Sequence, residues 1–185
     1  MKKTFEEFVK EIGLTSAVII CYRDTEKVPA TRFSKGQRSM RPDLPEGILD
    51  RLPFEEWMGV IRDPSLRLTD NLRKIGHKKA SELANTPGQC ISYLRYFGIE
   101  CQQDRDVLER LIMTGDFLEL RDIRHRIPFE DPLIAVWMKR FVELAEESGD
   151  FDCWLDVCEQ AESKSPERKL ALRKMCELEE LSINF

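Results

Sequence analysis

Apolar residues recur at helical spacing along most of the chain, and the clearest pattern lies near its C-terminal end. From Phe151 onward, apolar side chains follow at intervals of three or four residues, at positions 154, 157, 158 and 161. Asp150 precedes this run as an N-cap, and Ser165 followed by Pro166 marks the start of a second helix. The pattern therefore predicts two consecutive helices within 150–182.

The same signals occur 34 residues earlier in the chain. A shift of 34 residues aligns TGDF at 114–117 with SGDF at 148–151, and seven of the 32 residues in 117–148 are identical to their counterparts in 151–182. A period of 34 residues is the length of a tetratricopeptide repeat, and residues 107–182 resemble such repeats in period. The Gly and Tyr of the tetratricopeptide pattern are missing from the first helix. We therefore expect stacked antiparallel helical hairpins of period 34.

The N-terminal part of the chain shows a more mixed pattern. Thr4 and Glu7 have the spacing of a capping box, followed by an apolar helical face. The β-branched run at 16–22 is compatible with one strand of a short β-hairpin, paired with 27–33. Residues 53–60 repeat the Phe, Trp and Val spacing of the last hairpin, so Trp57, like Trp154, is expected in the core.

These patterns together predict a mainly α fold with three parts. Residues 1–52 form an N-terminal helix with the short β-hairpin and a loop, residues 53–108 a helical central module, and residues 109–185 the helical repeats. The longest uninterrupted apolar run, at 17–22, is far shorter than the roughly 20 residues of a membrane helix. We therefore expect a cytoplasmic protein without a membrane partner.

The central module has the spacing of a nucleic-acid-binding motif. Leu72, Ile75, Gly76, Ala80 and Leu83 have the apolar, glycine and small-residue spacing of a helix-hairpin-helix, with a turn at the glycine. A second glycine follows the phenylalanine at position 97. Residues 64–108 resemble the C-terminal domain of the bacterial RNA polymerase α subunit, which is built from two such hairpins.

This resemblance implies a set of DNA-contacting positions. Arg67 matches the family's principal DNA-contacting arginine and Gly98 its second-hairpin glycine, while Lys78 and Lys79 would add charge beside the backbone amides that face phosphate. Asp70 and Glu100 replace an asparagine and a lysine of the family, which puts the phosphate contact in doubt. A plain helical segment at 66–108, without this ancestry, remains the alternative.

The charge distribution also favours a polyanion contact in the first half of the chain. Residues 1–97 carry 17 Lys and Arg against 13 acids, a net +4, whereas residues 98–185 carry 12 against 21, a net −9. Between residues 31 and 42 the chain holds four cations and no acid, namely Arg32, Lys35, Arg38 and Arg41. Such clusters are typical of polyanion-binding surfaces, but an ordinary solvated surface explains them equally well.

The residues show no pattern typical of an enzyme or a metal protein. The six cysteines form no CxxC pair, only two histidines could complement them as ligands, and no glycine-rich phosphate loop, HExxH or GxSxG motif occurs. We therefore expect neither catalytic residues nor cofactors nor metals, and reduced cysteines that pack as small apolar residues.

Two functions follow from these features, and an enzyme without a recognisable motif is a third hypothesis that no residue pattern supports. The first is a non-catalytic adaptor or regulator, whose basic N-terminal half contacts DNA, RNA or another polyanion while its acidic helical repeats contact a protein. The alternative is a purely protein-directed interactor or inhibitor, for example of phage or bacterial origin, that binds no nucleic acid.

Overall fold

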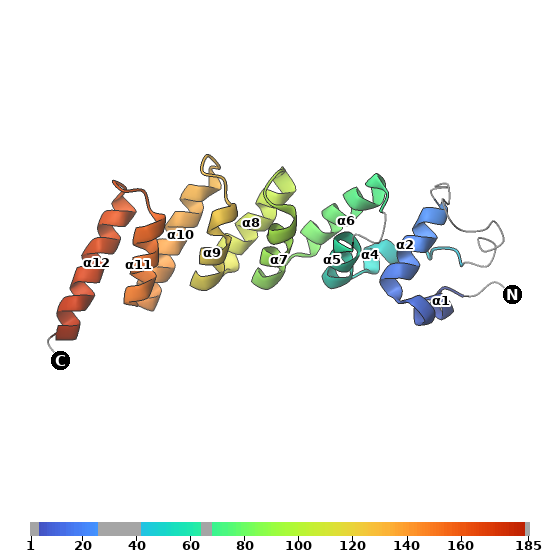
Figure 1. Cartoon of the computed structure of the whole chain (residues 1–185), viewed down its shortest axis with the longest axis horizontal. Coiled ribbons are helices and arrows are strands. Elements are labelled where there is room, and N and C mark those ends of the chain that lie inside the picture. Colours follow the sequence, from blue (N-terminus) through green and yellow to red (C-terminus); the bar gives the residue numbers. More distant parts are fainter. Residues whose placement is uncertain (1–3, 26–41, 64–67, 184–185) are drawn as a thin grey trace. The chain divides into compact units, whose positions relative to one another are not determined.

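The computed structural model describes residues 4–25, 42–63 and 68–183, and every regular element in these ranges is a helix (Figure 1). The predicted mainly α fold is thereby confirmed. The chain divides into two compact units, Met1–Leu83 and Ala84–Phe185. None of the described helices combines the length and the apolar content that a membrane span requires.

The first unit is built from α1 (Phe5–Ile12), α2 (Leu14–Thr25), α4 (Ile48–Arg51), α5 (Phe54–Arg62) and α6 (Asp70–Leu83). Helix α2 packs on both α1 and α5, and α5 packs on α6. The predicted capping box is confirmed, because the Thr4 hydroxyl accepts from the Glu7 amide at 3.2 Å and the Glu7 carboxylate accepts from the Thr4 amide at 2.9 Å. The predicted core position of Trp57 is also confirmed, since its side chain is fully buried.

The predicted strand at 16–22 is wrong, because these residues lie inside α2. Five of the seven are buried, namely Ala17, Val18, Ile19, Cys21 and Tyr22. Burial on this scale outweighs the β preference of branched side chains, which is a weak term that depends on packing. The second predicted strand, at 27–33, lies outside the described residues.

The predicted turn at Gly76 is also wrong, because this glycine lies in the middle of α6. A Cβ atom added there would lie 3.0 Å from Cγ1 of Ile61 and 3.3 Å from the ring of Trp57. The glycine therefore allows α6 to approach α5 closely and does not reverse the chain. Gly98, by contrast, does end a helix, in a positive-φ conformation of 77°.

The second unit contains three successive pairs of helices (Figure 1). Helices α7 (Pro87–Phe97) and α8 (Gln102–Thr114) form the first pair, and α11 (Phe151–Gln160) and α12 (Pro166–Ile183) form the last. Between them, α9 (Phe117–Ile123) and the short 3-10 helix η1 (Arg124–Arg126) precede α10 (Leu133–Ser148). Helices α9 and α11 thus begin 34 residues apart, at Phe117 and Phe151.

Side-chain caps determine where these helices begin. The Asp116 carboxylate accepts from the Glu119 amide at 2.9 Å, and the Asp150 carboxylate accepts from the Asp152 amide at 3.1 Å. The first pair has a cap of its own, a capping box between Thr86 and Gln89, which lies outside the 34-residue alignment. Each cap satisfies a backbone donor that would otherwise lack a partner at the helix start.

Stacked aromatic rings hold α9 against α10. The Phe117 and Phe141 rings lie 4.1 Å apart between centroids, and Phe141 stacks on Trp137 at 4.7 Å. The Trp137 indole also donates a hydrogen bond to the Leu120 carbonyl oxygen at 3.0 Å. The first helices of neighbouring pairs are joined at the surface by ion pairs, among them Arg121 with Asp156 at 2.8 Å.

The burial of Trp154 yields a stability prediction. Its side chain is 2% exposed, so replacement by Ala leaves a cavity and should lower the free energy of unfolding by about 3–5 kcal/mol. Leu155→Ala is the matched control, because Leu155 is 40% exposed and its loss should cost less than about 1 kcal/mol. Urea denaturation of both variants measures the difference. Equal effects of the two substitutions would show that Trp154 is not a core residue.

Candidate protein-binding groove

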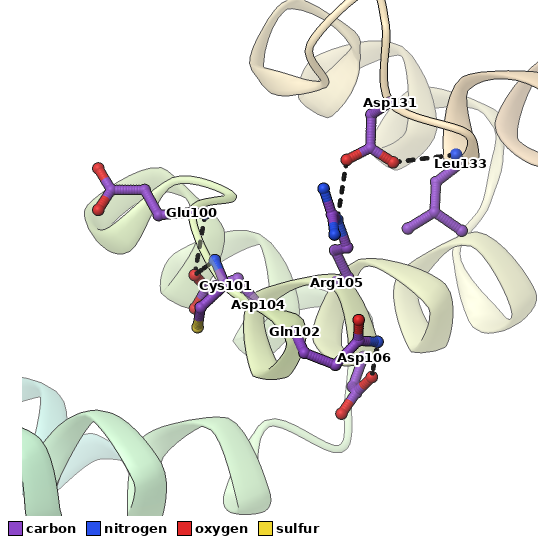
Figure 2. A network of polar contacts seen from close by, with 8 residues as sticks. All are labelled: Glu100, Cys101, Gln102, Asp104, Arg105, Asp106, Asp131 and Leu133. Atoms are coloured by element: carbon purple, nitrogen blue, oxygen red, sulfur yellow. Dashed lines mark hydrogen bonds and ion pairs between the residues drawn. The ribbon is translucent and has the colours of Figure 1, made fainter.

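Asp104 of α8, drawn in Figure 2 with its contacts to Glu100 and Cys101, has a buried carboxylate. The residue is only 1% exposed. One of its oxygens accepts from the Tyr93 hydroxyl at 2.6 Å. The other accepts from the backbone amides of Glu100 at 3.0 Å and Cys101 at 2.9 Å. With these three donors in place, the carboxylate caps the start of α8 and is not poised as a general base.

Tyr93 is held in its protonated form by this arrangement. Burial raises the pKa of Tyr93 far above its ordinary value, and the neighbouring Asp104 carboxylate raises it further. The hydroxyl therefore remains a hydrogen-bond donor at neutral pH, which the buried carboxylate requires.

Asp131, which is 4% exposed, has a similar structural role at the start of α10. One oxygen accepts from the Nε of Arg105 on α8 at 3.0 Å, and the other accepts from the Leu133 amide at 3.0 Å. Figure 2 shows the Asp131 side chain between these two donors. The carboxylate therefore caps α10 and links this helix start to α8.

A groove lies between α10 and α12, where three hollows follow one another along the two helices. Their volumes are about 260, 290 and 350 Å³ in order from the start of α10 to its end. Helix α10 contributes Ala135, Met138, Val142 and Glu146, and α12 contributes Glu167, Leu170, Lys174, Leu178 and Leu181. Trp154 of α11 also lines the third hollow, and Glu162, which follows α11, lines the first. Residues spaced by three and four positions share one face of a helix, so the side chains of α10 and α12 form two facing rows. We call this surface the α10–α12 groove.

The groove combines an apolar lining with unpaired carboxylates. Glu146, Glu162 and Glu167 line it without an ion pair to any described residue. Two further acids are already neutralised, since Glu143 pairs with Arg140 at 3.4 Å and Glu177 with Lys174 at 3.3 Å. The groove therefore offers apolar contact area beside negative charge that lacks an internal partner.

Of the positions predicted to bind nucleic acid, the structure describes Gly76, Lys78 and Lys79 in the first unit and Gly98 in the second. Arg32, Lys35, Arg38, Arg41 and Arg67 lie outside the described ranges. Gly76 is buried inside α6 of the first unit, whereas Gly98 belongs to the second unit.

The two predicted lysines of α6 are already engaged with acids. Lys79 pairs with Asp50 at 2.8 Å and with Glu82 at 3.5 Å, and Lys78 lies 3.8 Å from Glu82. The hydrogen bond between Lys79 and Asp50 raises the pKa of the lysine and lowers the pKa of the carboxyl. Their charges are therefore partly compensated before any phosphate arrives.

The sequence patterns did not identify the groove. Leu170, Leu178 and the core residue Ala171 all belong to one helical apolar pattern, which cannot tell which side chains face the interior and which line a surface hollow. The sequence feature that relates to the groove is the excess of acids in the C-terminal half. Glu146, Glu162 and Glu167 all belong to that half. No family model, curated protein or solved structure matches the chain.

The Tyr93 to Asp104 hydrogen bond predicts a specific loss of stability. Tyr93→Phe leaves one oxygen of a buried carboxylate without its hydroxyl donor, and should lower the free energy of unfolding by about 1–3 kcal/mol. Tyr96→Phe, at a 46% exposed tyrosine of the same helix, is the control and should change it by less than about 0.5 kcal/mol.

The same bond determines how stability responds to alkali. Folding raises the pKa of Tyr93 above the ordinary tyrosine value of 10.0. The contribution of protonated Tyr93 to the free energy of unfolding is therefore complete below pH 10.0 and declines as the pH rises above that value. The stability gap between wild type and Tyr93→Phe should therefore shrink in alkali, as followed by urea titrations. A gap that is independent of pH, or absent at neutral pH, would contradict this role.

Proposed function

We propose that this protein is a non-catalytic binding protein whose second unit holds an amphipathic helix of a partner protein in the α10–α12 groove. The observation that carries the proposal is the combination of two facing rows of side chains at helical spacing with three unpaired carboxylates. Helix-in-groove recognition uses this type of surface, with apolar anchors at intervals of three and four residues.

The dimensions of the groove support a helical segment as the occupant. Between Ile134 and Glu146, α10 lines the groove over 12 residue steps, which correspond to about 18 Å of helix. A partner helix of about three turns has this length and presents three or four apolar anchors along one face. Two hollows, of about 260 and 290 Å³, are smaller than the roughly 300–1,000 Å³ of small-molecule pockets, and the third, of about 350 Å³, is near the lower end of that range. Such volumes match a side chain better than a cofactor.

The charge of the second unit supports a basic partner. Residues 98–185 carry a net charge of −9, and the unpaired carboxylates of Glu146, Glu162 and Glu167 lie along the groove. Lys and Arg side chains beside the apolar anchors of the partner would find counter-charges there. Such complementarity speeds association and selects among partners more than it adds affinity.

Two features support a non-catalytic role. The buried carboxylates Asp104 and Asp131 are used as helix caps, as their hydrogen bonds show. Burial is also the main factor that raises the pKa of the Cys90 thiol, which disfavours the reactive thiolate form.

A second candidate function is polyanion contact by the first half of the chain. Its support is the run of four cations without an acid between residues 31 and 42. The two functions are compatible, because they involve different parts of the sequence, and each has its own test.

The groove proposal predicts which peptides the protein selects. A random peptide library displayed on phage and panned against the full chain should yield sequences with apolar residues at intervals of three and four, together with an excess of Lys and Arg. The double variant V142K/L170K places two charges in the groove. It should lower the affinity of the protein for the selected peptides by at least about tenfold.

The matched control is V136K/L172K, which makes the same kinds of change on the same two helices. Val136 and Leu172 are 47% and 49% exposed and do not line the three hollows. The control should retain wild-type affinity. Selected peptides without helical spacing, or with equal affinity for both double variants, would refute the groove as the binding site.

The polyanion candidate predicts a steep dependence on salt. If the basic run contacts phosphates, the quadruple variant R32A/K35A/R38A/R41A should weaken binding to single-stranded RNA or duplex DNA in an electrophoretic assay. It should also flatten the salt slope by up to about 4, close to one unit for each phosphate that the variant no longer neutralises. Absence of any mobility shift for the wild-type chain at low salt would eliminate this candidate and leave the protein-directed function.

A further inference from the structure

One end of the α10–α12 groove contains an arginine in an unusual setting. Arg124, in η1, lines the first hollow, with its guanidinium carbon 5.2 Å from the centre of the Phe129 ring and 5.5 Å from that of the Trp137 ring. Trp137 is fully buried, whereas Phe129 is 64% exposed. The cation is therefore held between an interior ring and a ring at the surface.

Among the described residues, this guanidinium has one hydrogen-bond acceptor. Arg124 donates from one terminal amino group to the Ile127 carbonyl oxygen at 3.3 Å. Its Nε atom is buried and has no hydrogen-bond partner among the described residues, and the side chain makes no ion pair with a described carboxylate. A guanidinium has five donors, and a partly buried cation without a counter-charge is unfavourable.

Burial lowers the pKa of Arg124 below the ordinary arginine value, because it disfavours the charged form. The rings supply a weak attraction, but neither ring accepts a conventional hydrogen bond from the terminal amino groups. A carboxylate in the hollow would supply both the missing charge and the missing acceptor.

The remainder of the hollow indicates what else the ligand carries. Ile134, Ala135 and Met138 of α10 line it with apolar atoms, and Glu162 and Glu167 contribute carboxylates. Neither carboxylate lies within ion-pair distance of Arg124, so the hollow keeps one positive and two negative groups apart. A ligand that satisfies all of them has a carboxylate, an aliphatic stretch and a cation.

We infer that this hollow is an anchor subsite, in which Arg124 binds the carboxylate of an Asp or Glu side chain on the partner helix. The inference rests on the proposed function and makes the partner more specific. The hollow has a volume of about 260 Å³, which suits one or two side chains. In this arrangement the acidic residue of the partner helix binds at the end of the groove where α10 begins, and the partner's basic residues lie closer to Glu146. The charges therefore determine the direction in which the partner helix binds.

The test compares two capped tetrapeptides, acetyl-Glu-Leu-Leu-Lys-amide and acetyl-Gln-Leu-Leu-Lys-amide, which differ only at the carboxylate. Each is titrated into the ¹⁵N-labelled full chain while the arginine Nε–H signals are recorded. The Arg124 signal should shift with saturation, and the Glu peptide should bind at least about tenfold more tightly than the Gln peptide. The Arg105 signal is the internal control, because its Nε already donates to Asp131.

Two protein variants complete the experiment. Arg124→Met should remove the difference between the two peptides, whereas Arg126→Met, at an exposed arginine of the same short helix, should retain it. If Arg124→Met fails to fold, the comparison of the two peptides on the wild-type chain still tests whether Arg124 binds the peptide carboxylate.

Equal affinity of the two peptides, no shift with either, or the same shift at every arginine would overturn the subsite. The phage selection tests the groove independently of this subsite. If the phage selection yields the expected peptides but the tetrapeptide titration fails, only the Arg124 subsite is refuted.

Discussion

The arrangement of the second unit depends on the hydrogen bonds that the buried Asp131 carboxylate accepts. This carboxylate receives hydrogen bonds from Arg105 of α8 and from the first amide of α10, so a single charged group fixes where α10 begins and joins it to the preceding pair of helices. Loss of either donor would leave a carboxylate that is 4% exposed with too few partners, which is among the most costly defects in a folded protein. One wall of the α10–α12 groove is therefore fixed before any ligand arrives.

The opposite face of α10 is fixed by aromatic packing. Phe141 stacks on Phe117 of α9 and on Trp137, and the Trp137 indole donates a hydrogen bond to the α9 backbone. The face that remains outside this packing carries Ala135, Met138 and Val142, which line the groove. Preorganisation of this kind favours binding, because little conformational entropy is lost when the partner docks.

The sequence predicts the helical class and several helix starts because these depend on local chemistry. The caps at Thr4, Asp116 and Asp150 lie where the side-chain spacing places them, and all three bind backbone amides. The strand expected at 16–22 failed because burial of Ile19 and its neighbours in α2 outweighs their β preference. The turn expected at Gly76 failed because a glycine can serve close helix packing as well as a turn, and only the contact with Ile61 and Trp57 distinguishes the two.

The candidate site was less predictable than the fold, since it depends on contacts between distant residues. The sequence shows the net charge of each segment, but the pairing of Lys79 with Asp50 and the separation of Arg124 from Glu167 depend on tertiary contacts. The acidity of residues 98–185 led us to expect protein contact in this half of the chain, but it did not predict the position of the groove. The proposed function therefore depends on which charges have no ion-pair partner among the described residues, and only the tertiary structure shows this.

The central claim is that a partner helix binds between α10 and α12. Amide hydrogen exchange of the full chain, measured with and without a peptide selected by the wild-type protein, tests it most directly. Bound peptide is expected to slow exchange in Leu133–Ser148 and Pro166–Ile183, while exchange in Asp70–Leu83 is unchanged. Slowing centred on Asp70–Leu83, or slowing that leaves α10 and α12 unaffected, would contradict it.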